Sequence, residues 1–320
     1  MDKHNSLRGA GMVLLAAVIW GTTGTAQTLA PAGFSSYWVG ALRLVVATVF
    51  FAGWAAFLPG TAAAGTSHGS AEASKKPALL LTLGAGAFMA VFNLAFFAGI
   101  SKAGIATGTA VAIGSGPIWA GLLQALTTGR MPPAGWWAGT LCAVAGGALM
   151  VLGQGGTATA AGTGVALCLL AGLCYAGYAL CSKSLVRVAS TTWATLGVFG
   201  AAALLALPAA FVISGAPSSA PAGWWVVLYL GVVATGIAYM LFARALRHIA
   251  GATGVTLALG EPVTAFALAV LVVGERPRAI AFLGLALVLA GLAIVVWREV
   301  RGAASEETAT PASGGRAVAG

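Results

Sequence analysis

Charged residues are scarce in this sequence of 320 residues, and their scarcity excludes most soluble proteins. Only 7% of the residues are charged, 16 Lys and Arg against 7 Asp and Glu, whereas 59% are hydrophobic. Soluble domains carry about 25% charged residues, which cover the surface that faces water. So few charges cannot cover a 31.6 kDa globule, and the mean hydropathy of +0.96 agrees. A cytosolic enzyme, a nucleic-acid-binding protein and a disordered chain are therefore excluded, and a multi-pass membrane protein remains.

The side chains that membrane enzymes use for catalysis or metal binding are also rare. Asp2 is the only Asp, and the three His residues fall in expected loops or chain ends. The four Cys residues lie in or beside apolar segments, without metal-ligand spacing to a His. Intramembrane metalloproteases and acyltransferases need such groups within their spans, and the Walker phosphate-binding motif is missing. We therefore expect no catalytic residue, no metal site and no cofactor.

Long apolar segments are abundant. A helix needs roughly 20 residues to cross a hydrocarbon core of about 30 Å, and the segments lack the period-2 alternation of a membrane barrel. Ten segments qualify: 10–30, 35–57, 78–99, 103–127, 134–153, 161–182, 191–213, 222–243, 249–273 and 279–297. The expected fold class is therefore an all-α integral membrane protein with ten transmembrane helices. Residues 59–77 and 302–320 are rich in Ala, Gly and Ser or Thr, and we expect a mobile loop and a disordered cytoplasmic tail.

Lys and Arg are distributed unevenly between the two ends of these spans. If the N-terminus is cytoplasmic, 12 of the 16 fall on the cytoplasmic side and three, Lys102, Arg276 and Arg278, fall outside. Positive residues concentrate in cytoplasmic loops, so we expect both termini inside the cell and the protein in the cytoplasmic membrane. The same bias accounts for the net charge of +9, and no nucleic-acid partner is expected.

An internal repeat divides the chain into two halves. With a shift of 145, residues 114–151 and 259–296 agree at 12 of 38 positions, and Pro117 meets Pro262. The halves, 1–153 and 161–298, then hold five spans each. Because five is odd, the second half enters the membrane inverted. Inverted repeats are typical of secondary transporters, whose substrate site lies between the repeats near the midplane.

The repeated prolines mark the fourth and ninth spans. Proline lacks an N–H and clashes with the carbonyl four residues before it, so we expect kinks that free the carbonyls of Ile113 and Ala258. In lipid, such carbonyls belong against protein or a water-filled cavity. Pro117 and Pro262 are therefore structural or gating candidates at a substrate cavity, with a packing kink as the alternative.

Two charges lie well within the spans. Glu261 is the only acidic residue there, at a cost of about 2.5–3.5 kcal/mol in the centre of an inserted helix. It is a candidate for binding substrate or a proton, and the alternative is a neutral Glu bonded to carbonyls loosened by Pro262. Arg43 lies halfway along the second span. We expect a structural partner for it, with gating or binding of a substrate carboxylate as the alternative.

These features resemble the EamA-type branch of the drug/metabolite transporter superfamily over about residues 8–298. The most specific part is Gly260-Glu261-Pro262-Val263, followed by Val273-Gly274-Glu275-Arg276-Pro277. The first half keeps Pro117 and Gly129 but has Arg130 where the family pattern often has Glu. The resemblance implies a ten-helix carrier whose central cavity is lined by the first, third, fourth, sixth, eighth and ninth helices. Besides Glu261, the polar and aromatic candidates on these helices are Trp20, Asn93, Trp119, Tyr175, Tyr178 and Tyr239, with packing as the alternative for each.

The expected function is secondary transport of a small organic solute by alternating access. The resemblance implies that the solute is an amino acid, another metabolite or a drug, and it favours export. Transport is expected to be coupled to protons or to proceed by exchange. A membrane enzyme of lipid or polyprenyl metabolism, and a channel or non-transporting membrane protein, are the alternatives. The expected partners are the solute and the lipid bilayer, and the sequence leaves the oligomeric state open.

Overall fold

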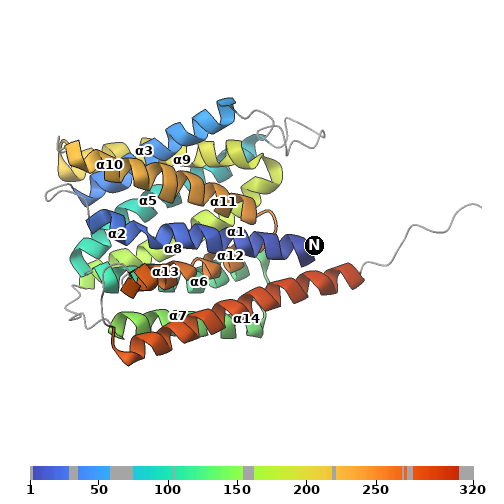
Figure 1. Ribbon diagram of the computed structural model, residues 1–320. Coiled ribbons are helices and arrows are strands. Elements are labelled where there is room, and N and C mark those ends of the chain that lie inside the picture. The colour runs from blue at the N-terminus through green and yellow to red at the C-terminus, as the bar shows by residue number, and fades with distance from the viewer. Residues whose placement is uncertain are drawn as a thin grey trace, which may run out of the picture.

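The chain folds into one bundle of helices (Figure 1). The computed structural model describes residues 3–28, 35–57, 75–103, 105–153, 162–217, 221–268, 270–271 and 277–309, and every regular element in these ranges is a helix. In chain order they are α1 (Lys3–Gly21), α2 (Thr23–Thr28), α3 (Ser36–Phe57), α5 (Lys75–Ala103), α6 (Ile105–Thr128), α7 (Ala134–Gly153), α8 (Gly162–Val188), α9 (Thr191–Ser214), α10 (Pro221–Tyr229), η1 (Leu230–Ile237), α11 (Ala238–Ala245), α12 (Gly251–Leu257), α13 (Gly260–Leu268) and α14 (Ala279–Ala309).

Seven helices within the described ranges are long and apolar enough to cross a membrane. They are Ser36–Phe57, Pro77–Ala103, Gly108–Thr128, Gly162–Val188, Thr191–Ser214, Gly223–Ala245 and Ala279–Arg301, and an eighth apolar helix, Ala134–Met150, is shorter. Large apolar side chains such as Leu126, Val212 and Leu271 are more than 80% exposed on the outside of the bundle. Large apolar side chains exposed in this way suit lipid rather than water.

The first and ninth expected spans are interrupted. Residues 10–30 are divided between α1 and α2 at Thr22, and residues 249–273 between α12 and α13 at Ala258 and Leu259. Neither segment is therefore a single long helix. Broken helices inside a membrane protein occur where their free backbone groups face protein or a cavity, which directs attention to these two breaks.

The ends of the two expected irregular segments are partly helical. α5 already begins at Lys75, and α14 continues to Ala309. Pro77 lies in the first turn of α5, where proline is tolerated, and the Ala and Glu residues near the end of α14 favour helix. Residues 58–74, residues 310–320 and the family-like positions 272–276, which include Glu275, lie outside the described residues.

The repeat is visible in how the helices pack. α7 and α14 lie side by side at one edge of the bundle (Figure 1). A Cβ added at Gly146 would lie 2.6 Å from the carbonyl oxygen of Gly284, and one at Gly139 would lie 2.9 Å from that of Gly291. Gly139 and Gly284 are repeat partners, as are Gly146 and Gly291, so the two contacts are the same contact made twice. Such reciprocity is typical of a two-fold axis.

Other helix pairs repeat in the same way. α5 packs against α8, so the third expected span contacts the sixth. α11 packs against α1, so the eighth expected span contacts the first. Exchanging the two halves turns one pair into the other. α3 also packs against α9, the second span against the seventh. The centre of the bundle is therefore built from both halves.

Candidate functional site

A small cavity lies where the two halves meet. Its volume is about 50 Å³, and it is lined by Trp20, Thr23, Arg43, Phe92, Phe96, Ala112, Ile113, Tyr175, Tyr239, Ala258 and Glu261. These residues come from the first, second, third, fourth, sixth, eighth and ninth expected spans. The set therefore includes every helix that the family resemblance implies, together with α3, which contributes Arg43.

Glu261 reaches this cavity because the ninth span is broken just before it. α12 ends at Leu257, and the N–H of Glu261 donates to the carbonyl of Ala258 at 2.9 Å, which begins α13 one turn later. Pro262 therefore lies in the first turn of a new helix, where its missing N–H leaves no intrahelical bond unmade. The expectation that Pro262 kinks a continuous helix and frees the Ala258 carbonyl is wrong, because that carbonyl already has a partner.

Pro117 differs from its repeat partner. It lies inside α6, which continues from Ile105 to Thr128. The residues four positions before the two prolines, Ile113 and Ala258, both line the cavity. The residues one turn before the two prolines therefore line the same cavity from opposite halves, although the helix is interrupted at Pro262 and continuous at Pro117.

Arg43 has a structural partner in the eighth span. The side chain is 5% exposed, and its Nε donates to Oγ1 of Thr235 at 2.8 Å. The same hydroxyl donates to the carbonyl of Leu230 at 2.6 Å, and the Arg43 guanidinium lies 5.7 Å from the ring centre of Phe97. Arg43 is thus held in place while lining the same cavity as Glu261. Two opposite charges therefore line one cavity inside the bundle, where they attract each other more strongly than in bulk water.

The eighth span contains an eight-residue π-helix, η1, which the sequence analysis did not anticipate. Thr235 belongs to it, and the indole N–H of Trp20 donates to the carbonyl of Ala234 at 2.9 Å. Long π-helices are rare, and short ones are frequent at functional sites. The one feature of the sequence that marks this segment is a lone Thr, Thr235, between Gly231 and Gly236 in an apolar span. These two glycines pack against Val46 and Phe50 of α3.

Aromatic rings surround the cavity. Trp20 lies 4.9 Å from Tyr239 and 6.3 Å from Tyr175 between ring centres. The hydroxyl of Tyr175 is buried without a hydrogen-bond partner. It can therefore still donate a hydrogen bond and accept one. A buried polar group of this kind needs an explanation, and a bound water or solute in the adjoining cavity would supply one.

Three of the substrate-site candidates lie away from the cavity lining. Tyr178 is 1% exposed and packs behind Tyr175 and Tyr239. Asn93 is equally buried, and its Nδ2 donates to the carbonyl of Met89, one turn earlier in α5. Trp119 keeps a buried Nε1 without a partner. Of the seven candidates, Trp20, Tyr175, Tyr239 and Glu261 line the cavity, whereas Thr23, Phe92 and Phe96 line it without having been singled out.

Comparisons with known proteins show the family and the fold of the chain. Residues 7–152 and 162–297 both match the EamA-like transporter family. The "Uncharacterized transporter YwfM" of Bacillus subtilis (strain 168) is 35% identical over 283 residues, which cover 88% of this chain and 92% of the relative. The "Uncharacterized transporter YxxF" of the same organism is 29% identical over 138 residues, 43% of either chain. A solved structure described as "Crystal structure of protein" has a TM-score of 0.73 at 19% identity, covers 94% of this chain and 99% of its own, and shows a shared fold.

Proposed function

Because the chain belongs to the EamA-like transporter family, we propose that it moves a small organic solute across the cytoplasmic membrane by alternating access. The observation that carries this proposal is the cavity between the halves, which Arg43 and Glu261 line together with aromatic side chains. Secondary transporters bind their substrates between their repeats, beside interrupted helices. The break between α12 and α13, just before Glu261, supports a site of this kind here.

The proposed topology has ten crossings in two inverted halves, 1–153 and 161–298, with both termini in the cytoplasm. The reciprocal glycine contacts of α7 and α14 support the two-fold relation between the halves. The excess of Lys and Arg at one side of the bundle supports the orientation. Under this topology, α1 begins at the cytoplasmic side.

The small volume of the cavity is consistent with a closed conformation. About 50 Å³ holds a water molecule or two, whereas sites for metabolites or drugs usually measure about 300–1,000 Å³. Solute binding therefore requires the halves to separate around this point. Beside the cavity the backbone departs from a regular α-helix at the π-helix η1, at the turn at Thr22, and at the turn at Ala258 and Leu259. We propose that η1 and the turn at Ala258 and Leu259 rearrange.

Glu261 is the proposed coupling residue. A carboxyl in this position can release a proton to one side of the membrane, or bind a cationic group of the solute. Arg43, held by Thr235, is the proposed fixed countercharge or the partner of a solute carboxylate. The proposed solute is an amino acid, another metabolite or a drug, and export is the proposed direction by analogy with the family. Exchange is the alternative to proton coupling.

Counterflow in liposomes tests the proposal. Purified protein is reconstituted in liposomes loaded with each member of a solute panel, and uptake of the labelled solute is followed with and without an imposed pH gradient. Saturable counterflow that disappears in a Glu261→Gln variant supports a carrier with Glu261 at its site. Single-channel currents or turnover of lipid, in place of saturable flux, would overturn it.

A further inference from the structure

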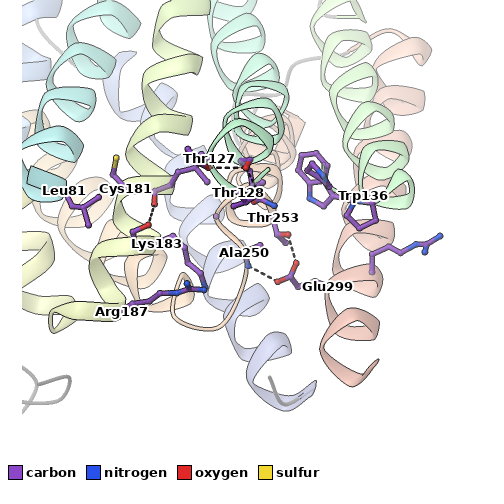
Figure 2. A pocket seen from close by; sticks show the side chains of 18 residues that line it. Leu81, Thr127, Thr128, Trp136, Cys181, Lys183, Arg187, Ala250, Thr253 and Glu299 are labelled. Atoms are coloured by element: carbon purple, nitrogen blue, oxygen red, sulfur yellow. Dashed lines mark hydrogen bonds between the residues drawn. The ribbon is translucent and has the colours of Figure 1, made fainter. Parts of the chain in front are cut away.

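A second, larger pocket lies at the end of the bundle at which α1 begins (Figure 2). Its volume is about 590 Å³, and it shares no residue with the cavity of Arg43 and Glu261. It is bounded by the end of α6, the start of α7, the end of α8, the start of α12 and the end of α14. The transport mechanism proposed above assigns it no role.

The pocket carries an excess of positive charge. Lys183, Arg187 and Arg298 line it, and Glu299 is the one acidic residue in the lining. Figure 2 shows how Glu299 is used: Oε1 accepts the N–H of Ala250 at 2.9 Å, and Oε2 accepts the hydroxyl of Thr253 at 2.6 Å. Both carboxylate oxygens are thus bonded to the start of α12, and three cations against one carboxylate leave the lining with an excess of positive charge.

The positive field extends to the loop beside the pocket. Nζ of Lys183 donates to the carbonyls of Leu246 and Ile249, at 2.6 and 2.7 Å, and so brings its charge to this loop. Burial, together with the charges of Arg247, Lys183 and Arg8, lowers the pKa of His248 below its usual range. A neutral His in this position is what a surplus of nearby cations favours.

The lining of this pocket also includes a residue whose hydrogen-bond donor has no partner. Trp136 lines it and is 4% exposed, and its Nε1 is buried without a partner. An indole nitrogen donates and never accepts. A partner for this nitrogen would be an acceptor, and beside three cations the acceptor best matched to the site is an oxyanion.

Arg298 has a prepared position next to Trp136. Its guanidinium lies against Gly135, where any Cβ would overlap it, and 5.2 Å from the ring of Trp297. The planar guanidinium suits carboxylate and phosphate groups. A residue larger than Gly at position 135 would push Arg298 away from this position.

We propose that this pocket binds an organic anion through a phosphate or carboxylate group, with Trp136, Arg298 and Arg187 as its ligands. The volume falls within the range of metabolite sites. Thr127, Thr128 and Ser184 donate their hydroxyl hydrogens to carbonyls of their own helices, which leaves oxygen lone pairs for the hydroxyl groups of a ligand. The anion is either a free solute or the headgroup of an anionic lipid.

Radioligand binding tests this inference without any transport. The full chain is placed in phosphatidylcholine nanodiscs, and binding of labelled sn-glycerol 3-phosphate and glutarate is measured by scintillation proximity, with glycerol as the neutral probe. We expect saturable binding of at least one anion and none of glycerol. Arg298→Gln and Trp136→Phe should weaken binding, at least about tenfold for Arg298→Gln, which removes charge-assisted bonds. Arg130→Gln, which removes an exposed cation outside the pocket, should not.

A lipid arm separates the two sources of the anion. If the ligand is a lipid headgroup, phosphatidylglycerol nanodiscs should raise the Tm of the wild type more than they raise the Tm of Arg298→Gln. The lipid should then also compete with the soluble probe. Glu261→Gln should bind the probes as the wild type does, so that a failure of the transport proposal leaves this one standing. Equal binding by Arg298→Gln, Trp136→Phe and wild type, or no response to any anion or anionic lipid, overturns the inference.

Discussion

Arg43 of α3 donates its Nε–H to the hydroxyl of Thr235, 2.8 Å away, and this bond joins a charged side chain of one half to the π-helix of the other. The hydroxyl passes its own hydrogen to the carbonyl of Leu230. The hydroxyl of Thr235 therefore accepts a hydrogen bond from the charged side chain of the cavity and donates one to the irregular backbone beside it.

Replacing Thr235 by Val should destabilise the protein, since the shape is kept while the Arg43 Nε loses its acceptor. Leaving a buried charged donor unsatisfied costs about 1–3 kcal/mol or more. A lower Tm in detergent is the expected result, and Thr235→Ser, which keeps the hydroxyl, should stay near the wild type. Equal Tm values for the Val and Ser variants would contradict this account of Arg43.

Glu261→Gln should reduce counterflow by at least about tenfold and remove its dependence on an imposed pH gradient. Gln has almost the same shape but neither carries a proton nor balances a cation. Initial rates in liposomes at several pH values measure both effects. Glu306→Gln, in the part of α14 beyond the membrane segment Ala279–Arg301, is the control. Unchanged rates and an unchanged pH profile in Glu261→Gln would rule out coupling through this carboxyl.

Gly146→Ala should destabilise the packing of α7 on α14, because the new Cβ would lie 2.6 Å from the carbonyl oxygen of Gly284 and from the backbone N of Val288. Overpacking of this kind costs about 1–3 kcal/mol. The adjacent Gly147 has open space around its added Cβ, so Gly147→Ala should be neutral or stabilising by up to about 1 kcal/mol. Thermal unfolding of the two variants compares them directly, and a similar Tm for both would refute the close approach.

Tyr175→Phe should leave stability unchanged, since the hydroxyl that it removes has no hydrogen-bond partner. If that hydroxyl contacts the solute, the counterflow KM rises by about three- to tenfold, the value of one ordinary hydrogen bond. Tyr178→Phe is the matched control, because Tyr178 lies behind the cavity and not in its lining. A lower Tm for Tyr175→Phe with an unchanged KM would show a structural hydroxyl instead.

The repeated prolines and glycines predicted much of the fold, because proline and glycine affect the backbone and the helix packing at their own positions. Gly139, Gly146, Gly284 and Gly291 stand in register in the sequence, and they make the reciprocal contacts of α7 and α14. Residues 114–151 and 259–296 thus predicted that two copies exist, and hydropathy predicted where most helices lie. Neither signal contained the breaks at Thr22 and at Ala258, which depend on contacts with distant helices.

The site was only partly predictable. An intramembrane charge is costly wherever it lies, so Arg43 and Glu261 were identifiable without a structure. Which uncharged side chains accompany them depends on helix rotation, because residues one or two positions apart point in different directions. Asn93 turns back to Met89 in its own helix, whereas Phe92 and Phe96 face the cavity. The π-helix places Thr235 beside Arg43, and no local pattern specifies that rotation.

The helix α12 has one end in each of the two cavities. Ala250 and Gly251 at its start line the anion pocket, and Ala258 directly after it lines the cavity of Glu261. All seven of its residues are buried, and it spans about 10 Å at 1.5 Å per residue. A displacement at one end is therefore transmitted to the other. If a ligand of one cavity and the solute of the other each prefer one position of α12, each changes the affinity of the other, and by thermodynamic reciprocity by the same factor.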